Sequence, residues 1–391
     1  MSGVISCFTS YYSESQIDKS SLEARTPPLP IYSAPINKVA YLKALILDAV
    51  FYGTSLLIIY NIAPLYIGKI LGVNLLPLSR RAWTVLKILS PLFIYRLAQI
   101  FVGIPIHPAY VPFFNSLISL ISRASLEEHR TKNLPVGYLP MRFSAESSTR
   151  HQIDGMFLKR DGVDLSGRCL LISHGNGMLY EHIMEDQGIL DLANKLNAHI
   201  LFYNYAGTGR SSGWFPNRDA MVASHEVMHS ILQQIGTSQI FDFGWSIGGG
   251  VKWRDHFESP KKENTTIIDY QTFRSTSGFA KEPLGRVGEI IVKFLQWEYN
   301  SEEVSKKFQG QHIIVQDGNP ETGEVFHDGV MSVENSLATG ASSEKVILMN
   351  TRRIYSYTDL VGGRALFLGD PVHCLPLDQG TVNQIGTKIA N

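Results

Sequence analysis

The chain has 391 residues, more than one typical domain, and 44% of them are hydrophobic, which lies within the globular range. Lysine plus arginine and aspartate plus glutamate each number 35, so the formal net charge is zero and no basic excess points to nucleic acid. Cys7, Cys169 and Cys374 are scattered and lack the spacing of a metal site. We therefore expect reduced thiols in a reducing compartment rather than a disulfide scaffold.

The N-terminal third of the chain divides into a polar tail and a hydrophobic region. Residues 1–40 are rich in serine and proline and lack the layout of a cleaved signal peptide, which predicts a flexible tail. Residues 49–68 carry no charge and are about long enough to cross a bilayer as a helix, whereas the uncharged residues 97–122 are broken by three prolines. We therefore predict that residues 41–125 form a hydrophobic helical region that associates with a membrane. The alternative is an apolar helical layer packed against the main domain or a partner.

The rest of the chain predicts a linker at residues 126–140 and a catalytic domain at residues 141–391. Apolar runs predict first a pair of antiparallel strands and then further strands, each followed by a turn or a loop. Periodic apolar positions predict two helices. The expected strands are 141–143, 152–158, 169–173, 199–203, 238–243, 265–270, 312–316 and 345–349, and the expected helices are 183–196 and 218–235. This order is typical of an α/β domain with a mostly parallel sheet flanked by helices.

Three of the predicted strands end in motifs rich in glycine. Residues 174–177 read His-Gly-Asn-Gly, and residues 204–213 read Asn-Tyr-Ala-Gly-Thr-Gly-Arg-Ser-Ser-Gly. Residues 244–248 read Gly-Trp-Ser-Ile-Gly and fit the pattern Gly-x-Ser-x-Gly. After a strand, that pattern predicts a nucleophile elbow, a sharp strand-to-helix turn that projects the hydroxyl of Ser246.

These motifs, in this order, resemble those of the serine α/β-hydrolase superfamily, and of bacterial members with an N-terminal hydrophobic region. The resemblance covers roughly residues 142–376 and implies the α/β-hydrolase fold. It also implies a catalytic triad whose members follow in the order nucleophile, acid, histidine.

That order selects the triad candidates. Ser246 would be the nucleophile, and His373 is the only histidine beyond Asp328. We prefer Asp328 as the acid because the residues that follow it resemble the superfamily's step into a short helix. Asp317, which we expect in a turn, and Asp269 remain alternatives.

The resemblance also implies an oxyanion hole, which needs two donors aimed at the developing negative charge. We assign these donors to the backbone N–H groups of Ile247 and Asn176, and we expect His174 to brace the loop. Residues 271–308 could form a lid over the serine or a helix packed on the sheet.

The leading hypothesis is a serine esterase that forms an acyl-enzyme on Ser246. If residues 41–122 sit in a bilayer, lipid acyl esters become the most accessible substrates. An acyltransferase using the same serine and a non-catalytic, membrane-tethered binding protein are the alternatives. We expect an acyl substrate as the partner, and neither a cofactor nor a metal ion, because no histidine, cysteine and carboxylate cluster stands out in the sequence.

Overall fold

The computed structural model describes residues 80–106 and 135–390, with gaps at 177, 214–216, 259–263, 329 and 350–375, together with some positions between 42 and 55. The predicted tail at residues 1–40 and the candidate base His373 therefore lie outside the described residues. So does most of the predicted membrane region. The first strand begins at Tyr138, inside the predicted linker.

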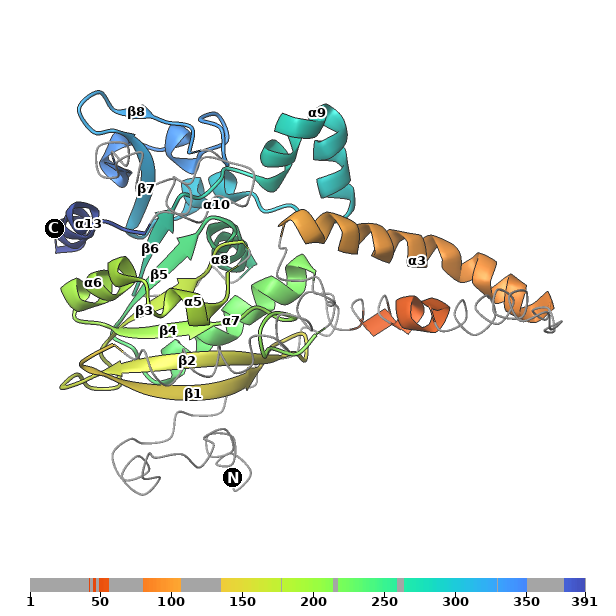
Figure 1. The fold of residues 1–391 in the computed structure, drawn as a ribbon, viewed down its shortest axis with the longest axis horizontal. Helices are drawn as coiled ribbons and strands as arrows, with labels where there is room; N and C mark the ends of the chain where they lie inside the picture. The colour runs from red at the N-terminus through yellow and green to blue at the C-terminus, as the bar shows by residue number, and fades with distance from the viewer. Residues whose placement is uncertain are drawn as a thin grey trace, which may run out of the picture.

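A nine-stranded sheet forms the centre of the described part of the chain (Figure 1). In space the strands follow the order β1-β2-β4-β3-β5-β6-β7, and both β8 and β9 pair with β7. β2 runs antiparallel to both of its neighbours, β1 and β4, whereas β4, β3, β5, β6, β7 and β9 run parallel. The strands are β1 (Tyr138–Glu146), β2 (Gln152–Arg160), β3 (Arg168–Ser173), β4 (His199–Tyr203), β5 (Gln239–Trp245), β6 (Thr265–Tyr270), β7 (His312–Asn319), β8 (Glu324–Val325) and β9 (Val346–Met349). The predicted α/β class with a mostly parallel sheet is confirmed.

Helices cover both faces of this sheet, so its central strands are buried on both sides. α6 (Gln187–Leu196) and α13 (Gln379–Ala390) pack into the core of one face, and α7 (Arg218–Gln234) and α8 (Ile247–Glu258) into the core of the other. Two further α-helices, α5 (Tyr180–Ile183) and α10 (Ser301–Lys307), are short. The longer α9 (Thr276–Phe294) and α3 (Arg80–Ile106) lie at one end of the molecule (Figure 1).

The predicted helix at residues 183–196 is two helices. α5 ends at Ile183 and α6 begins at Gln187. The cause is Asp186, whose carboxylate accepts a hydrogen bond from the Ile189 backbone N–H at 3.0 Å and so caps a new helix.

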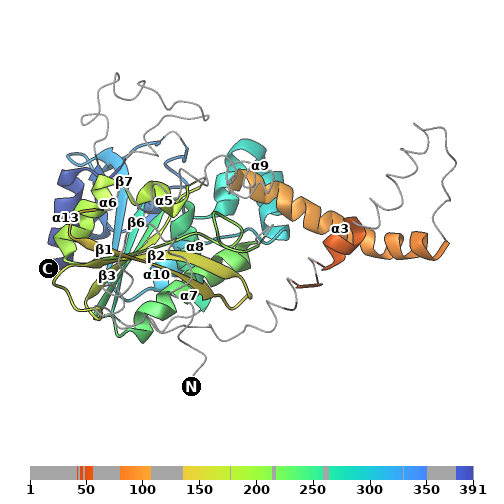
Figure 2. The ribbon, with the colours of Figure 1, turned by 60° about the horizontal axis from the view of Figure 1, so that its bottom comes forward.

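α3 projects from the body of the molecule, and its C-terminal half contacts the chain just after α9 (Figure 2). The indole N–H of Trp297 donates to the backbone carbonyl of Gln99 at 2.9 Å, and the Gln99 side chain donates to the carbonyl of Leu295 at 3.1 Å. The rings of Tyr95 and Phe294 meet edge to face with centroids 5.6 Å apart. This contact fits the alternative expectation of an apolar helical layer packed against the main domain.

The predicted membrane-associated location is wrong on the evidence of the described residues, none of whose helices is both long and apolar enough to cross a bilayer. α3 has the necessary length, at 27 residues, but its apolar run is interrupted. Arg96 and Gln99 lie in its second half, where both are buried and hydrogen-bonded to each other at 3.2 Å. The charged group of Arg96 and the amide of Gln99 thus face protein partners.

Candidate functional site

Ser246 occupies the turn between β5 and α8. Its φ angle is 52°, in the left-handed region that costs a side-chain-bearing residue about 1–2 kcal/mol. The backbone N–H of Ser246 donates to the carbonyl of Tyr270 at 2.9 Å, which fixes the turn to the end of β6. Ser246 is half-buried between the buried residues Trp245 and Ile247, so part of its surface stays accessible. The predicted strand–turn–helix context of the Gly-x-Ser-x-Gly motif is therefore present.

The glycines on either side of Ser246 are required by close packing. A Cβ atom on Gly244 would lie 2.6 Å from the Cα of Gly249, inside the distance that real side chains tolerate. A Cβ atom on Gly248 would overlap the carbonyl oxygen of Ser173 at the end of β3. The tight turn can thus form only because glycine at these positions lets the start of α8 pack directly against the neighbouring backbone.

The strain at Ser246 predicts a change in stability. We expect Ser246→Gly to have a free energy of unfolding about 1 kcal/mol higher than Ser246→Ala, because glycine adopts a φ of this sign without a steric penalty. Urea unfolding followed by circular dichroism measures the difference. Equal stabilities of the two variants would contradict a strained turn.

The two expected oxyanion donors lie at the start of α8 and in the turn after β3. Ile247 is the first residue of α8, where backbone N–H groups lack partners within the helix and the helix dipole favours negative charge. Asn176 lies in an exposed turn after β3. A Cβ atom on its neighbour Gly175 would come within 3.6 Å of the Trp245 carbonyl, so this turn runs against the residue that precedes Ser246.

His174 connects the turn that contains Asn176 to the neighbouring residue Tyr205. It is fully buried, its ring lies 4.4 Å from the ring of Tyr205, and its carbonyl accepts a hydrogen bond from the Tyr205 hydroxyl at 3.0 Å. Burial raises the pKa of Tyr205, so the phenol stays protonated and remains a donor. This arrangement fits the bracing role expected for His174.

Asp328 is fully buried beside the carboxyl end of β7. One carboxylate oxygen accepts hydrogen bonds from the backbone N–H groups of Val330 and Met331, at 3.0 and 2.8 Å. The Gln316 side chain on β7 donates to the other oxygen at 3.3 Å. The carboxylate is therefore held in one orientation, as a residue that orients a histidine must be.

The two alternative acids have different surroundings. Asp317, expected in a turn, lies inside β7 and pairs in register with Met349 of β9, because β7 continues to Asn319. Asp269 lies on β6, where Lys252 Nζ is 3.1 Å from one of its oxygens and His312 Nε2 is 2.8 Å from the other.

The two partners of Asp269, Lys252 and His312, favour the ionised form of its carboxylate. Burial acts to raise the pKa of Asp269, but the Lys252 ammonium and the His312 imidazole outweigh burial and lower it below its usual range. Asp269 is thus committed to an internal ion pair. Asp328 and Asp317, which lie near the end of β7, remain the candidates for the acid of the triad.

The register of the sheet sets the spacing between Ser246 and Asp328. Trp245 pairs with Tyr270, and Tyr270 pairs with Val315, so the next residues on the outer strands, Ser246 and Gln316, lie at the same level. Neighbouring strands are about 4.8 Å apart, which puts β5 and β7 roughly 10 Å apart. An imidazole that forms one hydrogen bond through each ring nitrogen separates its two partner atoms by about 8 Å. β9 ends at the same edge, at Met349.

α9 occupies the segment in which a lid or a packed helix was expected. Its buried residues are Thr276, Ser277, Gly288 and Val292, and its middle bends at Gly285, with Pro283 nearby. Leu284, Val287 and Ile290 expose 60%, 63% and 64% of their surface. Thus most of α9 does not pack on the sheet.

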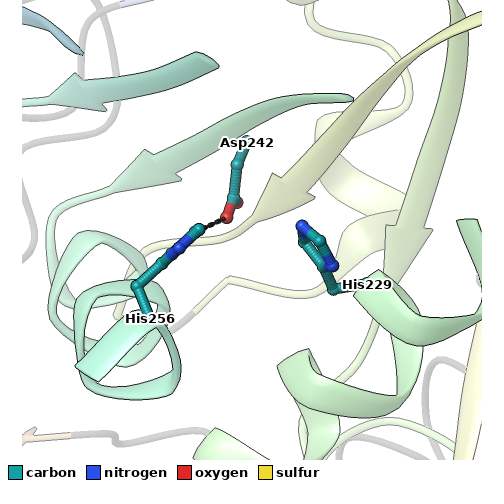
Figure 3. A group of neighbouring side chains, drawn as sticks. All are labelled: His229, Asp242 and His256. Atoms are coloured by element: carbon teal, nitrogen blue, oxygen red, sulfur yellow. Dashed lines mark hydrogen bonds and ion pairs between the residues drawn. The ribbon is translucent and has the colours of Figure 1, made fainter. Parts of the chain in front are cut away.

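A cluster of titratable side chains was missed by the sequence analysis. His229, Asp242 and His256 meet in the interior, although no metal-type spacing links them in the sequence (Figure 3). The signals that could have indicated them are an aspartate in the middle of the apolar run of β5 and two histidines four residues apart, His225 and His229, on one face of α7.

Comparison with solved structures gives distant similarities. The chain is similar to an alpha-beta hydrolase of Vibrio vulnificus, with 18% identity over 51% of this chain and 69% of that one and a TM-score of 0.38. It is similar to an esterase of Pyrococcus furiosus, with 15% identity over 51% and 74% of the two chains and a TM-score of 0.38. A putative hydrolase of Agrobacterium vitis S4 has 13% identity over 65% and 98%, with a TM-score of 0.41. Values this low leave the function to be argued from the residues of this chain.

Comparison of sequences places the chain in a family. No curated protein matches it. The sequence pattern described as "Chlamydia CHLPS protein (DUF818)" matches residues 147–389, which is more than half of the chain and includes β2 to α13. The chain belongs to the Chlamydia CHLPS protein family (DUF818).

Proposed function

We propose that the protein is a serine hydrolase that cleaves an acyl ester, with Ser246 as the nucleophile. The observation that carries the proposal is the left-handed backbone of Ser246 between β5 and α8, at the carboxyl edge of a parallel sheet. Strained backbone at an otherwise ordinary serine persists only where the surrounding structure enforces it, and such positions concentrate at reactive sites. A nucleophile elbow is the known arrangement that has this geometry and motif.

The proposed mechanism assigns a role to each candidate residue. His373 accepts the proton of Ser246 as the hydroxyl attacks the acyl carbonyl, and later donates it to the leaving group. Asp328 orients the imidazole and stabilises its charged form. The backbone N–H groups of Ile247 and Asn176 stabilise the oxyanion, and water then releases the acyl group. The fixed carboxylate of Asp328, two strands away from Ser246, supports this assignment.

The proposed substrate class is an ester with an apolar acyl chain. The support is α9, which follows β6 directly and exposes the apolar side chains of Leu284, Val287 and Ile290. Contacts with a hydrocarbon chain would remove this surface from water, at about 25 cal/mol per Å² buried.

Trapping of the acyl-enzyme tests the proposal. The purified protein is mixed with p-nitrophenyl esters of increasing chain length, quenched in acid and weighed by intact mass spectrometry. We expect the mass of one acyl group on the wild type, none on Ser246→Ala, and faster turnover of the longer esters. Adding a short alcohol separates hydrolysis from transfer, since a transferase would form the new ester. A folded wild type that neither acylates nor releases p-nitrophenol would contradict the proposal.

A further inference from the structure

Three potential metal ligands meet in the interior of the molecule, between the sheet and the helices α7 and α8 (Figure 3). His229 comes from α7, Asp242 from β5 and His256 from α8, and one ligand atom of each lies within 4.8 Å of the others. Their exposed fractions are 1%, 0% and 4%. We call these three residues the Asp242 cluster.

The position of Asp242 follows from the alternation of side chains along β5. Phe241 and Phe243 belong to the core under α6 and α13, so Asp242 points to the opposite face, with Ile240. A carboxylate buried there must be paired or must bind a metal ion. His256 Nε2 lies 2.9 Å from one oxygen of Asp242.

The other oxygen of Asp242 is held by a second pair. His225 Nε2 lies 3.0 Å from it, and His225 Nδ1 lies 2.5 Å from a carboxylate oxygen of Asp255. A ligand carboxylate supported in this way by an outer partner is a common feature of metal sites. The chain Asp255–His225–Asp242 therefore fixes one oxygen of Asp242 and leaves the other facing His256 and the site.

One member of the Asp242 cluster, His256, lines a cavity of about 880 Å³. His256 and Thr265 line this cavity, and the Thr265 hydroxyl is 3.3 Å from Nε2 of His229. Gln239 and Gln311, at the starts of β5 and β7, also line it, so it opens at the amino edge of the parallel strands. Ser246 follows the opposite, carboxyl end of β5. An ion would thus have a route to the cluster that is separate from the proposed esterase site.

A neighbouring buried aspartate, Asp269, has a different set of partners. At Asp269, His312 contacts one oxygen while the Lys252 ammonium lies 3.1 Å from the other, so a lysine supplies the cation. Toward Asp242 the same ammonium reaches only the backbone carbonyl, at 3.1 Å. The side chain of Asp242 instead faces imidazoles, which are themselves good metal ligands.

We propose that the Asp242 cluster binds a divalent transition-metal ion, with Zn²⁺ the best fit, through His229, Asp242 and His256. Two imidazoles and one carboxylate form a ligand set that zinc uses, and solvent from the cavity completes a tetrahedral site. The ligand atoms, which are between 2.9 and 4.8 Å apart, must adjust to roughly 3.3 Å, the separation imposed by bonds of about 2.0 Å. Rotation of the three side chains supplies this movement. The bound ion would join α7, β5 and α8.

Zinc titration of the full chain tests the proposal. The protein is stripped with a chelator, and Zn²⁺ is added in competition with a chromophoric chelator. We expect about one equivalent to bind tightly and to raise the melting temperature. His229→Ala and Asp242→Asn should each lower the affinity by about 100-fold or more, and Asp255→Asn, which acts through His225, by about 10-fold. The matched control is His312→Gln, which removes a buried, aspartate-bonded histidine elsewhere and should leave zinc affinity unchanged.

Two results would overturn the proposal. One is a folded wild type that binds no Zn²⁺, and the other is equal binding by the wild type and the cluster variants, as expected for adventitious surface sites. If the variants fail to fold, the visible absorption spectrum of Co²⁺ bound to the wild type tests the proposal instead. Intense visible bands of a four-coordinate ion support the site, and the weak spectrum of hydrated Co²⁺ refutes it.

Discussion

Ser246→Ala is expected to lower kcat/KM for p-nitrophenyl esters by about 10³-fold or more, with the fold intact. Alanine keeps the size of the side chain and removes only the hydroxyl that forms the acyl bond. The alanine variant should bind substrate almost as the wild type does, because the loops around the turn are held by Tyr270 and by the packing of Gly244 and Gly248. Steady-state kinetics with circular dichroism as the check on folding measures the effect.

The matched control for Ser246→Ala is Ser144→Ala. Ser144 lies on β1 at the far edge of the sheet, and its hydroxyl donates to the side chain of Gln152 at 3.2 Å. We expect this variant to retain wild-type activity. Ester turnover that is unchanged in Ser246→Ala would instead assign the activity to another residue.

Asp328→Asn is expected to lower kcat by about 10³- to 10⁴-fold with little change in KM. The amide keeps the shape of the carboxylate but cannot stabilise the charged imidazole that forms when His373 takes the serine proton. The bonds from the backbone N–H groups of Val330 and Met331 can still be accepted by the amide oxygen. We therefore expect the loss to appear in catalysis rather than in stability.

Two parallel variants separate the acid candidates. Asp317→Asn, on β7, should retain most of the activity if Asp328 is the acid. Asp269→Asn should mainly destabilise the fold, because it leaves the buried Lys252 ammonium without its carboxylate, a loss of about 3–5 kcal/mol. If Asp317→Asn is the variant with the large kcat defect and Asp328→Asn is not, the acid is Asp317.

The sequence predicted the sheet well where the strands are short apolar runs. The strands at residues 199–203 and 265–270 were predicted to the residue. The turn at Ser246 was predicted because Gly-x-Ser-x-Gly follows a strand, and the positive φ angle is a local property of that motif.

The errors arose where contacts between distant segments decide the structure. Asp317 was expected in a turn because Gly318, Asn319 and Pro320 follow it, but pairing with β8 and β9 extends the strand through Asn319. The hydrophobic region was expected in a membrane, but the sequence could not show that Gln99 of α3 would bond to Leu295 and Trp297.

The Asp242 cluster was missed for the same physical reason. His229, Asp242 and His256 come from a helix, a strand and a second helix, and only the packing of α7 and α8 on β5 brings them together. Regular spacing along the chain identifies ligands on one element, such as a pair four residues apart on a helix. It does not identify ligands that three elements contribute singly.

The central claim is that Ser246 is the nucleophile, and one measurement tests it most directly. The folded wild-type protein is treated with a fluorescent fluorophosphonate, digested, and analysed by mass spectrometry to locate the modified residue. We predict that the peptide containing Ser246 carries the label and that Ser246→Ala takes up none. A wild type that stays unlabelled while folded, or a label on a different serine, would contradict the claim.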